Sequence, residues 1–516
     1  MVEWWDDMNR RLHHCPCKKI LKRCCNQNQL IGEKLMKFSL RISRIATIAV
    51  PALLLTGCML GPNYKRVDNL TPGGYRAQTS ESPTSNTLAT MPWWDVFQDP
   101  QLQTLIRTAI ENNHDIKIAT IRVEEARDSL GVTNADLYPQ VTANGSAART
   151  RTADNSRAYI WPGGMPVPVS AYSNSYAAKL NLSYELDLWG RVRRSSESAR
   201  AQVLSSEEDR RTVLSGLVTD VAKSYFTLLE LDREMELTSA TLGTRQKTLS
   251  LMELKRKHGT ASDLEVNRYR AEVSSALATL AITKQTVAQN ENALSILLGQ
   301  APQDIQRGAA FRKQSPIPNI PLGAPSDLLE RRPDLKSAEQ QLVAANARIG
   351  VAKAAFFPQI SLTSQYGFQS SELKDLLKNN AEGWMIAAAA SQTVFDAGRN
   401  WFTYKASKAA CDRAVENYRK VILQALGEVS DALVAKEQSG EQYHQLQDQV
   451  RALQESVRLS DLRYQAGQSS YLDLLDAQRQ LFAAEIQSEQ ARLSELLASV
   501  RLYKSLGGGT EPAPVQ

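Results

Sequence analysis

The chain has 516 residues, a formal net charge of +6 and a sequence pI of about 8.8. Residues 1–57 hold ten basic and four acidic side chains, so basic and acidic residues balance at 51 each from position 58 onward. Because the positive excess lies entirely in this N-terminal part, the rest of the chain has no compositional support for nucleic-acid binding.

The first 35 residues precede a targeting segment and are polar. They hold cysteines beside a histidine pair, a composition that could suggest a metal site. These residues are His13, His14, Cys15, Cys17, Cys24 and Cys25. A targeting signal should not follow such a polar preface, so we interpret residues 1–35 as an upstream extension from a misassigned start codon and exclude them from the fold.

Residues 36–57 resemble a bacterial lipoprotein signal peptide. Two arginines precede the apolar run Ile45–Leu55, which at about eleven residues is too short to span a bilayer as a helix. The run ends in Leu55-Thr56-Gly57-Cys58, which is similar to a lipobox. The thiol of Cys58 would take a diacylglycerol and its freed amine a third acyl chain, which gives stable anchoring in outer membrane lipid. Met59 stands where an aspartate would retain a lipoprotein at the inner membrane.

Residues 58–92 are rich in Thr, Ser, Pro and Gly, with little apolar periodicity. We expect an extended tether that joins the lipid flexibly to the body. Only Cys58 and Cys411 remain in the mature chain, which excludes a framework of intramolecular disulfides. Cys411 is expected to be a small packing residue on a helix.

The body contains an internal duplication, with repeats at residues 93–299 and 329–507. Glu111–Gln140 reappears without a gap 219 positions later as Glu330–Gln359, and a second register of 208 positions relates later segments. The second register links Gly190 with Gly398, Leu254 with Leu462, Gly259 with Gly467, Ser262 with Ser470, Leu264 with Leu472 and Gly299 with Gly507. The difference of eleven residues lies before Gly190, where Tyr159–Pro168 reads as a loop. A Pro-rich crossover at 300–328 joins the repeats, and residues 508–516 form a tail.

In each repeat a helical pattern ends at an aromatic-proline pair, and a period of two begins. Strands are expected at about residues 139–150, 176–188, 358–369 and 384–395, the last with the weakest alternation. The clearest is Tyr176–Leu188, where apolar residues alternate with polar ones that include Lys179, Glu185 and Asp187. Such strands suit a transmembrane barrel, although a half-buried hairpin of a soluble protein has the same pattern. The outer membrane signal and the charged face favour the barrel.

Four strands are too few to close such a barrel, because outer membrane barrels begin at about eight strands. Open strand edges are not tolerated in lipid, where unpaired backbone groups have no water to bond. The chain is therefore expected to oligomerise.

Very long stretches without proline follow the strands, at Arg191–His258 and Arg399–Ala466. As a helix, each would be roughly 100 Å long at about 1.5 Å per residue, which no compact domain needs. They predict a coiled coil or a helical bundle. In the next helix a seven-residue spacing marks a packing seam at Val273, Leu280, Val287 and Leu294.

Each long stretch ends at a glycine that is followed by a capping box. Gly259 precedes Ser262-Asp263-Leu264-Glu265, and Gly467 precedes Ser470-Tyr471-Leu472-Asp473. Glycine allows the left-handed backbone that ends a helix, and the serine and the acid satisfy amides at the start of the next. Two tight helical hairpins are therefore expected at equivalent ends of the molecule. Capping alone could explain both Glu265 and Asp473.

The lipobox, the paired blocks, the tips "GTASDLE" and "GQSSYLDLLDAQR" and the terminal "LYKSLGGG" together resemble the outer membrane factors of tripartite efflux pumps. These are TolC-like channel-tunnels, and the OprM-type lipoprotein branch is the nearest in pattern. The resemblance implies an α+β membrane protein with a duplicated repeat of helix, two strands, long helix and hairpin. It implies a homotrimer in which twelve strands form one barrel in the cell outer membrane and twelve helices form a tunnel through the periplasm.

In this family the hairpin tips close the tunnel like an iris. The positions that match the gate are Leu472, Asp473, Asp476 and Arg479, with Tyr464 and Glu265 matching a pair that ties neighbouring helices. Asp473 and Asp476 lie three apart on one helical face, and threefold symmetry would bring their like charges together. A solvated first turn favoured by the helix dipole is the alternative. Ser469 stands where some family members carry an arginine latch.

The resemblance also implies partners and a function. A periplasmic membrane-fusion adaptor would dock on the tips, and an inner-membrane transporter of RND or MFS type would select the cargo. The docking positions are Gly259, Thr260, Ala261, Ser262, Gly467, Gln468, Ser469 and Ser470, although small residues also simply make tight turns. The chain is expected to be a passive exit channel for drugs, toxic compounds or metal ions, with no cofactor besides the lipid.

Two other classes of protein compete with this reading. An enzyme is disfavoured, because the histidines beyond the leader, His114, His258 and His444, are scattered and no nucleophile or phosphate-loop motif is present. Arg331-Arg332-Pro333-Asp334 is expected to open a helix at Pro333 rather than to act in catalysis. The second alternative is a lipid-anchored periplasmic helical scaffold without a pore, which would have no reason to make four strands.

Overall fold

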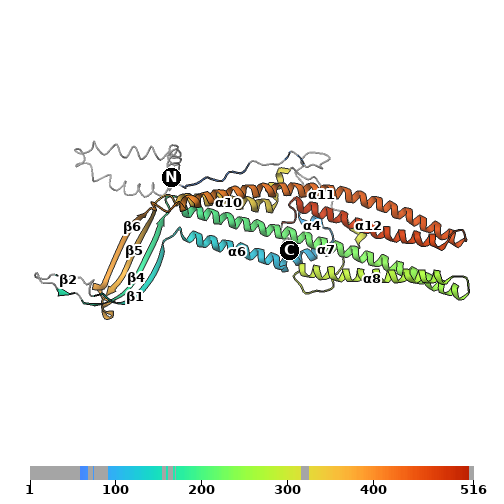
Figure 1. Cartoon of the computed structure of the whole chain (residues 1–516), viewed down its shortest axis with the longest axis horizontal. Coiled ribbons are helices and arrows are strands. Elements are labelled where there is room, and N and C mark those ends of the chain that lie inside the picture. Colours follow the sequence, from blue (N-terminus) through green and yellow to red (C-terminus); the bar gives the residue numbers. More distant parts are fainter. Residues whose placement is uncertain are drawn as a thin grey trace.

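The computed structural model describes residues 59–67, 72, 74, 91–153, 159–160, 167–168, 170–314 and 325–510. The signal peptide, Cys58 and the first 35 residues lie outside this part. The molecule is long and narrow, with a sheet at one end and two helical hairpins at the other (Figure 1). The described helices include none that is both long enough and apolar enough to cross a membrane.

The helices and strands repeat in the two registers that the sequence predicts. At an offset of 219, α6 (His114–Ala135) matches α10 (Pro333–Ala354), and β1 (Gln140–Arg151) matches β5 (Gln359–Ser370). At an offset of 208, α7 (Arg191–Lys257) matches α11 (Arg399–Gln465), and α8 (Asp263–Leu297) matches α12 (Tyr471–Ser505). The long helices have 67 residues each, and their return helices have 35 each. The duplication therefore holds at the level of single residues.

The four long strands form one antiparallel sheet in the order β1-β4-β5-β6, where β4 is Tyr172–Leu186 and β6 is Glu382–Ser391. Gln140 pairs with Ser183, Leu186 with Ile360, and Gln359 with Ser391. Every residue of β1 is exposed, and nearly every residue of β6, because each has a strand on one side only. One copy of the chain thus presents two open sheet edges.

Two strand predictions and one loop prediction differ in detail from the structure. β4 begins four residues earlier than expected, and β6 spans Glu382–Ser391 rather than 384–395. Val394 and Phe395 lie beyond β6 and are 95% and 82% exposed. The alanine run in β6 carries no alternation from which its end could be read. The segment Tyr159–Pro168, expected as a loop, begins and ends in a two-stranded ladder of β2 (Tyr159–Ile160) and β3 (Val167–Pro168).

The long helices lie side by side and continue from the sheet (Figure 1). Near the sheet the order is α6, α7, α10 and α11, and toward the far end α7 packs between α8 and α12. Gly190 and Gly398, with φ of 76° and 85°, make the turn from sheet to helix in both repeats. The expected seam of α8 is confirmed, because Val287 and Leu294 are buried in it and Val273 and Leu280 are half-buried.

The main core lies midway along the helices. Trp93 of α4 (Trp93–Val96) and Leu102 and Ile106 of α5 (Pro100–Asn112) pack there against the middle of α7. The described residues of the crossover and those just after it form three short helical segments. They are η5 (Phe311–Lys313), η6 (Pro325–Asp327) and α9 (Leu328–Arg331). Further 3₁₀ turns, η7 (Leu373–Asp375) and η8 (Asn379–Ala381), join β5 to β6. Cys411 is half-buried against this core, as expected.

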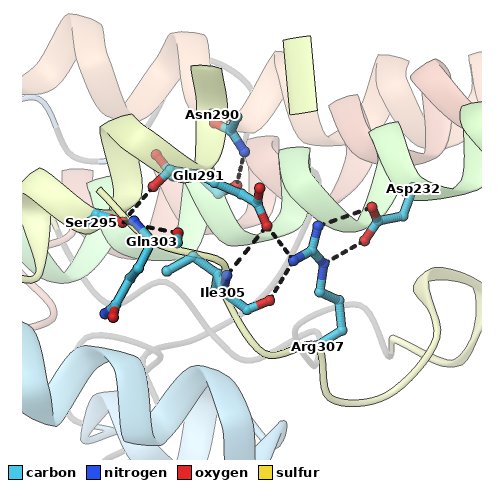
Figure 2. Close-up of polar contacts among 8 residues, drawn as sticks. Asp232, Asn290, Glu291, Ser295, Gln303, Ile305 and Arg307 are labelled. Atoms are coloured by element: carbon cyan, nitrogen blue, oxygen red, sulfur yellow. Dashed lines mark hydrogen bonds and ion pairs between the residues drawn. The ribbon is translucent and has the colours of Figure 1, made fainter. Parts of the chain in front are cut away.

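The crossover between the repeats is fixed to the helices by polar contacts. Figure 2 shows Arg307 between Asp232 of α7 and Glu291 of α8. Its Nε lies 2.7 Å from Asp232 Oδ2, and its Nη1 forms an ion pair with Glu291. Asp99 is 6% exposed and caps α5, and it also accepts from the Tyr225 hydroxyl at 2.9 Å and the Gln314 amide at 2.6 Å. These contacts hold the crossover against the core.

Two expectations on connecting segments have different outcomes. Pro333 begins α10, and Arg332 before it is buried and bonds Asp334, as expected for a helix start. The flexible join expected after the lipid site is wrong for residues 60–66. Arg194 of α7, which is 1% exposed, donates to the Leu60 carbonyl at 3.1 Å and to Asn63 Oδ1 at 2.7 Å, and holds the segment in place.

Candidate functional site

Both hairpin turns lie at the end of the molecule opposite the sheet (Figure 1). The first turn joins α7 to α8, and the second joins α11 to α12. The positions that the sequence marked as gate and docking residues all fall within these turns or within about two turns of helix from them. The structure thus brings the expected site residues to one end.

The same backbone geometry ends both long helices. Gly259 and Gly467 each have φ of 72°, in the left-handed region that favours glycine. In the first turn the Gly259 amide donates to the Arg256 carbonyl and the Thr260 amide to the Lys255 carbonyl, each at 2.9 Å. The second turn repeats the pattern, from Gly467 to Tyr464 at 3.0 Å and from Gln468 to Arg463 at 2.8 Å. Both are Schellman motifs, which satisfy the last carbonyls of a helix.

Capping boxes then open the return helices. The Ser262 amide donates to Glu265 Oε2 at 2.7 Å, and the Ser470 amide donates to Asp473 Oδ2 at 3.1 Å. The hydrogen bonds from Ser262 lower the pKa of Glu265 below its ordinary value. Both acids therefore have a capping role, whatever else they do.

Three of the expected gate residues are exposed on the first turns of α12. Leu472 is 46% exposed, and Asp473 and Asp476 are exposed beside it. Asp476 accepts a hydrogen bond from Gln480 at 2.6 Å and has no ion-pair partner among the described residues. The arrangement leaves one apolar and two acidic side chains exposed to another molecule or another copy of the chain, although both acids already accept a local hydrogen bond.

A small apolar cluster joins the two hairpins just above their turns, and we name it the tip cluster. Its members are Met252, Val266, Tyr269, Tyr471, Leu474 and Leu475. The rings of Tyr269 and Tyr471 lie 4.2 Å apart at their centroids, and Tyr464 packs edge-on to Tyr471 at 5.6 Å. Burial raises the pKa of Tyr471 above its ordinary value.

An ion-pair network lies beyond the tip cluster. Glu272 of α8 is 5% exposed; it bonds Arg479 of α12, and its Oε2 lies 3.1 Å from Nη1 of Arg245 on α7. Arg245 also donates to the Glu272 backbone carbonyl at 3.1 Å. The hydrogen bond to Glu272 raises the pKa of Arg479 above its ordinary value. One buried carboxylate thus ties three helices of two hairpins.

No hydrogen bond joins Tyr464 to Glu265 among the described residues of one copy, although the sequence matched them as a pair. Glu265 is occupied by Ser262, and the Tyr464 ring lies under the Lys255 ammonium at 5.7 Å instead. This cation–π contact also connects the two hairpins. Arg479, which the sequence placed at the gate, bonds Glu272, a residue the sequence did not single out.

The docking positions are mostly exposed. Gly259, Thr260, Ser262, Gly467, Gln468 and Ser470 are exposed, while Ala261 and Ser469 are half-buried. A Cβ added to Gly259 or Gly467 would meet nothing within 4 Å, so the glycines serve backbone conformation rather than close packing in one copy. The turns therefore offer narrow and uncrowded surfaces.

Sequence reasoning missed Arg245, Tyr269, Glu272 and Tyr471. Glu272 lies inside α8 with no capping or motif signal beside it, and its partners are 27 and 207 positions away. Tyr471 follows the capping serine and has no local sign of its burial. A pairwise comparison of the two hairpins could have marked these positions as different, because the 208 register places Gln480 opposite Glu272 and Leu453 opposite Arg245.

The sequence matches the model of one protein family, described as outer membrane efflux protein, over residues 105–300 and 324–508. It is 37% identical over 470 residues to the toluene efflux pump outer membrane protein TtgC of Pseudomonas putida, covering 90% of this chain and 95% of that protein. It is 33% identical over 459 residues to the cation efflux system protein CusC of Escherichia coli, covering 89% and 97%.

A solved structure has the same architecture. The open state of the MtrE outer membrane channel of Neisseria gonorrhoeae superposes with a TM-score of 0.78 at 33% identity, covering 88% of this chain and 99% of that one. The match spans the sheet, the long helices and the hairpins together. The sequence and structural similarities thus extend over nearly the whole described body.

Proposed function

This chain belongs to the outer membrane efflux protein family and is an exit channel of the outer membrane, and we propose that it conducts passively and is gated at its hairpin tips. The observation that carries the gate proposal is the coincidence of two features at one end of the molecule. Exposed Leu472, Asp473 and Asp476 stand next to an ion-pair network that ties the hairpins together.

The open sheet edges support assembly as a homotrimer. In the order β1-β4-β5-β6 neighbouring strands alternate in direction, so β6 of one copy can pair antiparallel with β1 of the next. Three copies would supply twelve strands, an even number within the range of bacterial outer membrane barrels. Two copies would give eight strands, and their helices would enclose a much narrower tunnel.

In such a trimer the first turns of α12 would come together around the threefold axis. Leu472 would narrow the tunnel, and the repeated carboxylates of Asp473 and Asp476 would favour cations and keep the closure wet. The Glu272 network would hold the second hairpin against the first and so maintain the closed position. A periplasmic adaptor that docks on the tips would open the gate by drawing the hairpins apart.

Cys58 is proposed as the lipid anchor. The described chain begins at Met59, which packs against Gly190. A Cβ added to Gly190 would lie only 2.7 Å from the Met59 side chain. Gly190 is the N-cap of α7 and lies just after the end of β4 at Leu186, so Cys58 would stand at the level where the barrel leaves the membrane. The acyl chains would then enter the periplasmic leaflet beside the barrel wall.

The partners are proposed to be a membrane-fusion adaptor and an inner-membrane transporter of the RND or MFS type. TtgC is named for toluene efflux and CusC for cation efflux, so we propose that the cargo is a toxic organic compound, a drug or a metal ion. No side chain of the wide conduit would need to bind the cargo specifically, because the transporter selects it.

Electron microscopy of the detergent-extracted protein, combined with conductance across planar bilayers, tests this function. We expect a threefold tapered tube whose helical part is roughly 100 Å long at about 1.5 Å per residue. Its conductance should be small at rest, with rare large openings. A compact monomer without conductance would support the lipid-anchored periplasmic scaffold instead.

A further inference from the structure

A pair of leucines is exposed just above each hairpin turn, at equivalent positions of the two repeats. Leu251 and Leu254 on α7 are 48% and 52% exposed, and Leu459 and Leu462 on α11 are 47% and 51% exposed. Each pair has a spacing of three residues, which places both side chains on one face of the helix. The 208 register relates the pairs residue by residue.

Assembly with neighbouring copies in a trimer would not cover these leucines. α11 is an edge helix of one copy, but α7 already packs between α8 and α12. Met252, next to Leu251, is 3% exposed and buried in the tip cluster, so the flank of α7 that faces α12 is filled. Leu251 and Leu254 stay exposed although both neighbours are present. By the equivalence of the repeats, Leu459 and Leu462 should remain exposed when a neighbouring copy covers the edge of α11.

The two tips differ in charge although they share the leucines. Residues 251–270 hold five basic and three acidic side chains, whereas the equivalent residues 459–478 hold one basic and three acidic. The first tip thus has a net charge of +2 and the second −2. Lys257 beside the first pair is exposed and has no partner among the described residues, and Asp461 beside the second bonds only Gln465 there.

We propose that the two leucine pairs are the apolar anchor points for the adaptor, and that the opposite charges set the chemistry of its contact surface. This inference rests on the proposed docking function and adds the partner's chemistry to it. The adaptor inserts an apolar side chain at each pair, with acidic groups facing the first tip and basic groups facing the second. Around a trimer the same apolar contact is repeated six times, while the charge alternates in sign and fixes the rotational register.

Binding of a purified adaptor to the trimeric channel in detergent tests the proposal. The probe is a purified periplasmic membrane-fusion adaptor from the organism that produces this channel. The variants are L251S/L254S and L459S/L462S, each compared with the matching methionine double variant, which keeps the apolar surface. We expect each serine variant to bind about tenfold more weakly or worse, and each methionine variant to bind like the wild type. L377S, on an exposed loop next to the sheet, is the control and should bind normally.

Charge variants test the second part of the proposal, which is that opposite charges at the two tips set the adaptor's contact surface. K257E and D461K each bring one tip to zero net charge, and both should weaken binding and reduce its dependence on salt. If either strengthens binding, the proposed pattern of signs is wrong. If a serine variant does not form trimers, these variants still test the charge pattern, and the single substitutions L254S and L462S take its place as the test of the leucines.

The outcomes separate the two proposals. If the wild type does not bind the adaptor, the docking function fails and the inference fails with it. If the wild type binds and the serine variants bind equally well, only the leucine anchors are refuted. Association of wild-type trimers with one another through their tips, abolished in the serine variants, would assign the leucines to a second copy of the channel and overturn the proposal.

Discussion

A single buried carboxylate carries much of the contact between the two hairpins. Glu272 is 5% exposed and is shared by Arg245 and Arg479, whereas most ion pairs near the tips are exposed. Exposed pairs contribute little to stability, but removing one partner of a buried pair leaves the others without compensation. The closed position should therefore depend far more on Glu272 than on the surface charges around it.

Replacing Glu272 by alanine tests this dependence. Arg245 and Arg479 would lose their shared acceptor and repel each other, which should favour separation of the hairpins by about 1–2 kcal/mol, or about a tenfold larger open fraction. Single-channel recordings of the trimer measure that fraction. Glu455→Ala, which removes an exposed carboxylate paired with Arg458, is the control and should leave it unchanged. An E272A channel as closed as the wild type would contradict the role of the network.

Glu230 gives the folded body a dependence on pH. It is 3% exposed on α7, and burial, with the nearby Glu234 and Glu489, raises its pKa to about 7. Its pKa is higher in the folded than in the unfolded chain, so the folded state binds the extra proton between about pH 4.5 and 7. Stability from this group is present at low pH and is lost as the pH rises through 7.

Glu230→Gln should therefore be more stable than the wild type at pH 8 and similar to it at pH 5. The midpoint of thermal loss of helical circular dichroism, measured at one heating rate, reports the difference. Glu437→Gln, at an exposed position of α11, should show no such change. If E230Q melts below the wild type at pH 8, the carboxylate is not the cause of the pH dependence.

At the scale of elements, the sequence predicts most of the features that both repeats share and few of the features that occur in only one place. The boundaries of the long helices follow from Gly190, Gly259 and their counterparts, because glycine and capping signals are local. The end of β6 depends on pairing with β5, and the early start of β4 depends on pairing with β1, neither of which a local pattern records. The docking of residues 60–66 on Arg194 depends likewise on a contact with a segment far along the chain.

The same distinction applies to the site. Asp473, Asp476 and the hairpin turns are visible in the sequence because capping and spacing mark them. The Glu272 network and the tip cluster are not, because their partners come from the other repeat. Resemblance to a family supplied the gate positions, and only the structure shows which of them make contacts in one copy.

The crossover makes its own prediction at this scale. Asp99 caps α5 and accepts hydrogen bonds from Tyr225 and Gln314, so one carboxylate joins α5, α7 and the crossover. Asp99→Ala should lose the cap and leave buried donors unpaired, at a cost of about 2–4 kcal/mol. We expect a lower thermal midpoint and faster proteolysis within residues 303–314. Asp95→Ala, at an exposed position of α4, is the control, and equal proteolysis of both variants would refute the role of Asp99.

At the scale of the whole molecule, the duplication gives a trimer six similar hairpins in a nearly sixfold arrangement. The side chains at the boundaries between hairpins do not follow this sixfold symmetry. The boundary between hairpins occurs in two forms, one within a copy and one between copies. Within a copy it is held by Arg479 and Glu272 together with Arg245. The 208 register maps these residues to Ala271, Gln480 and Leu453 at the boundary between copies, where no such ion pair can form.

The boundary between copies should therefore be the one that yields first when the gate opens. Introducing the missing pair as A271R/Q480E would place an arginine of one copy against a glutamate of the next, in the geometry that Arg479 and Glu272 have within a copy. We expect a smaller open fraction in bilayers and a higher temperature for dissociation of the trimer, whereas either single substitution should give neither effect. Because a partly buried pair gains only when both charges are present, the double variant must exceed the sum of the single ones. Additive effects of A271R and Q480E would mean that the two boundaries are not equivalent in space and that opening does not begin between copies.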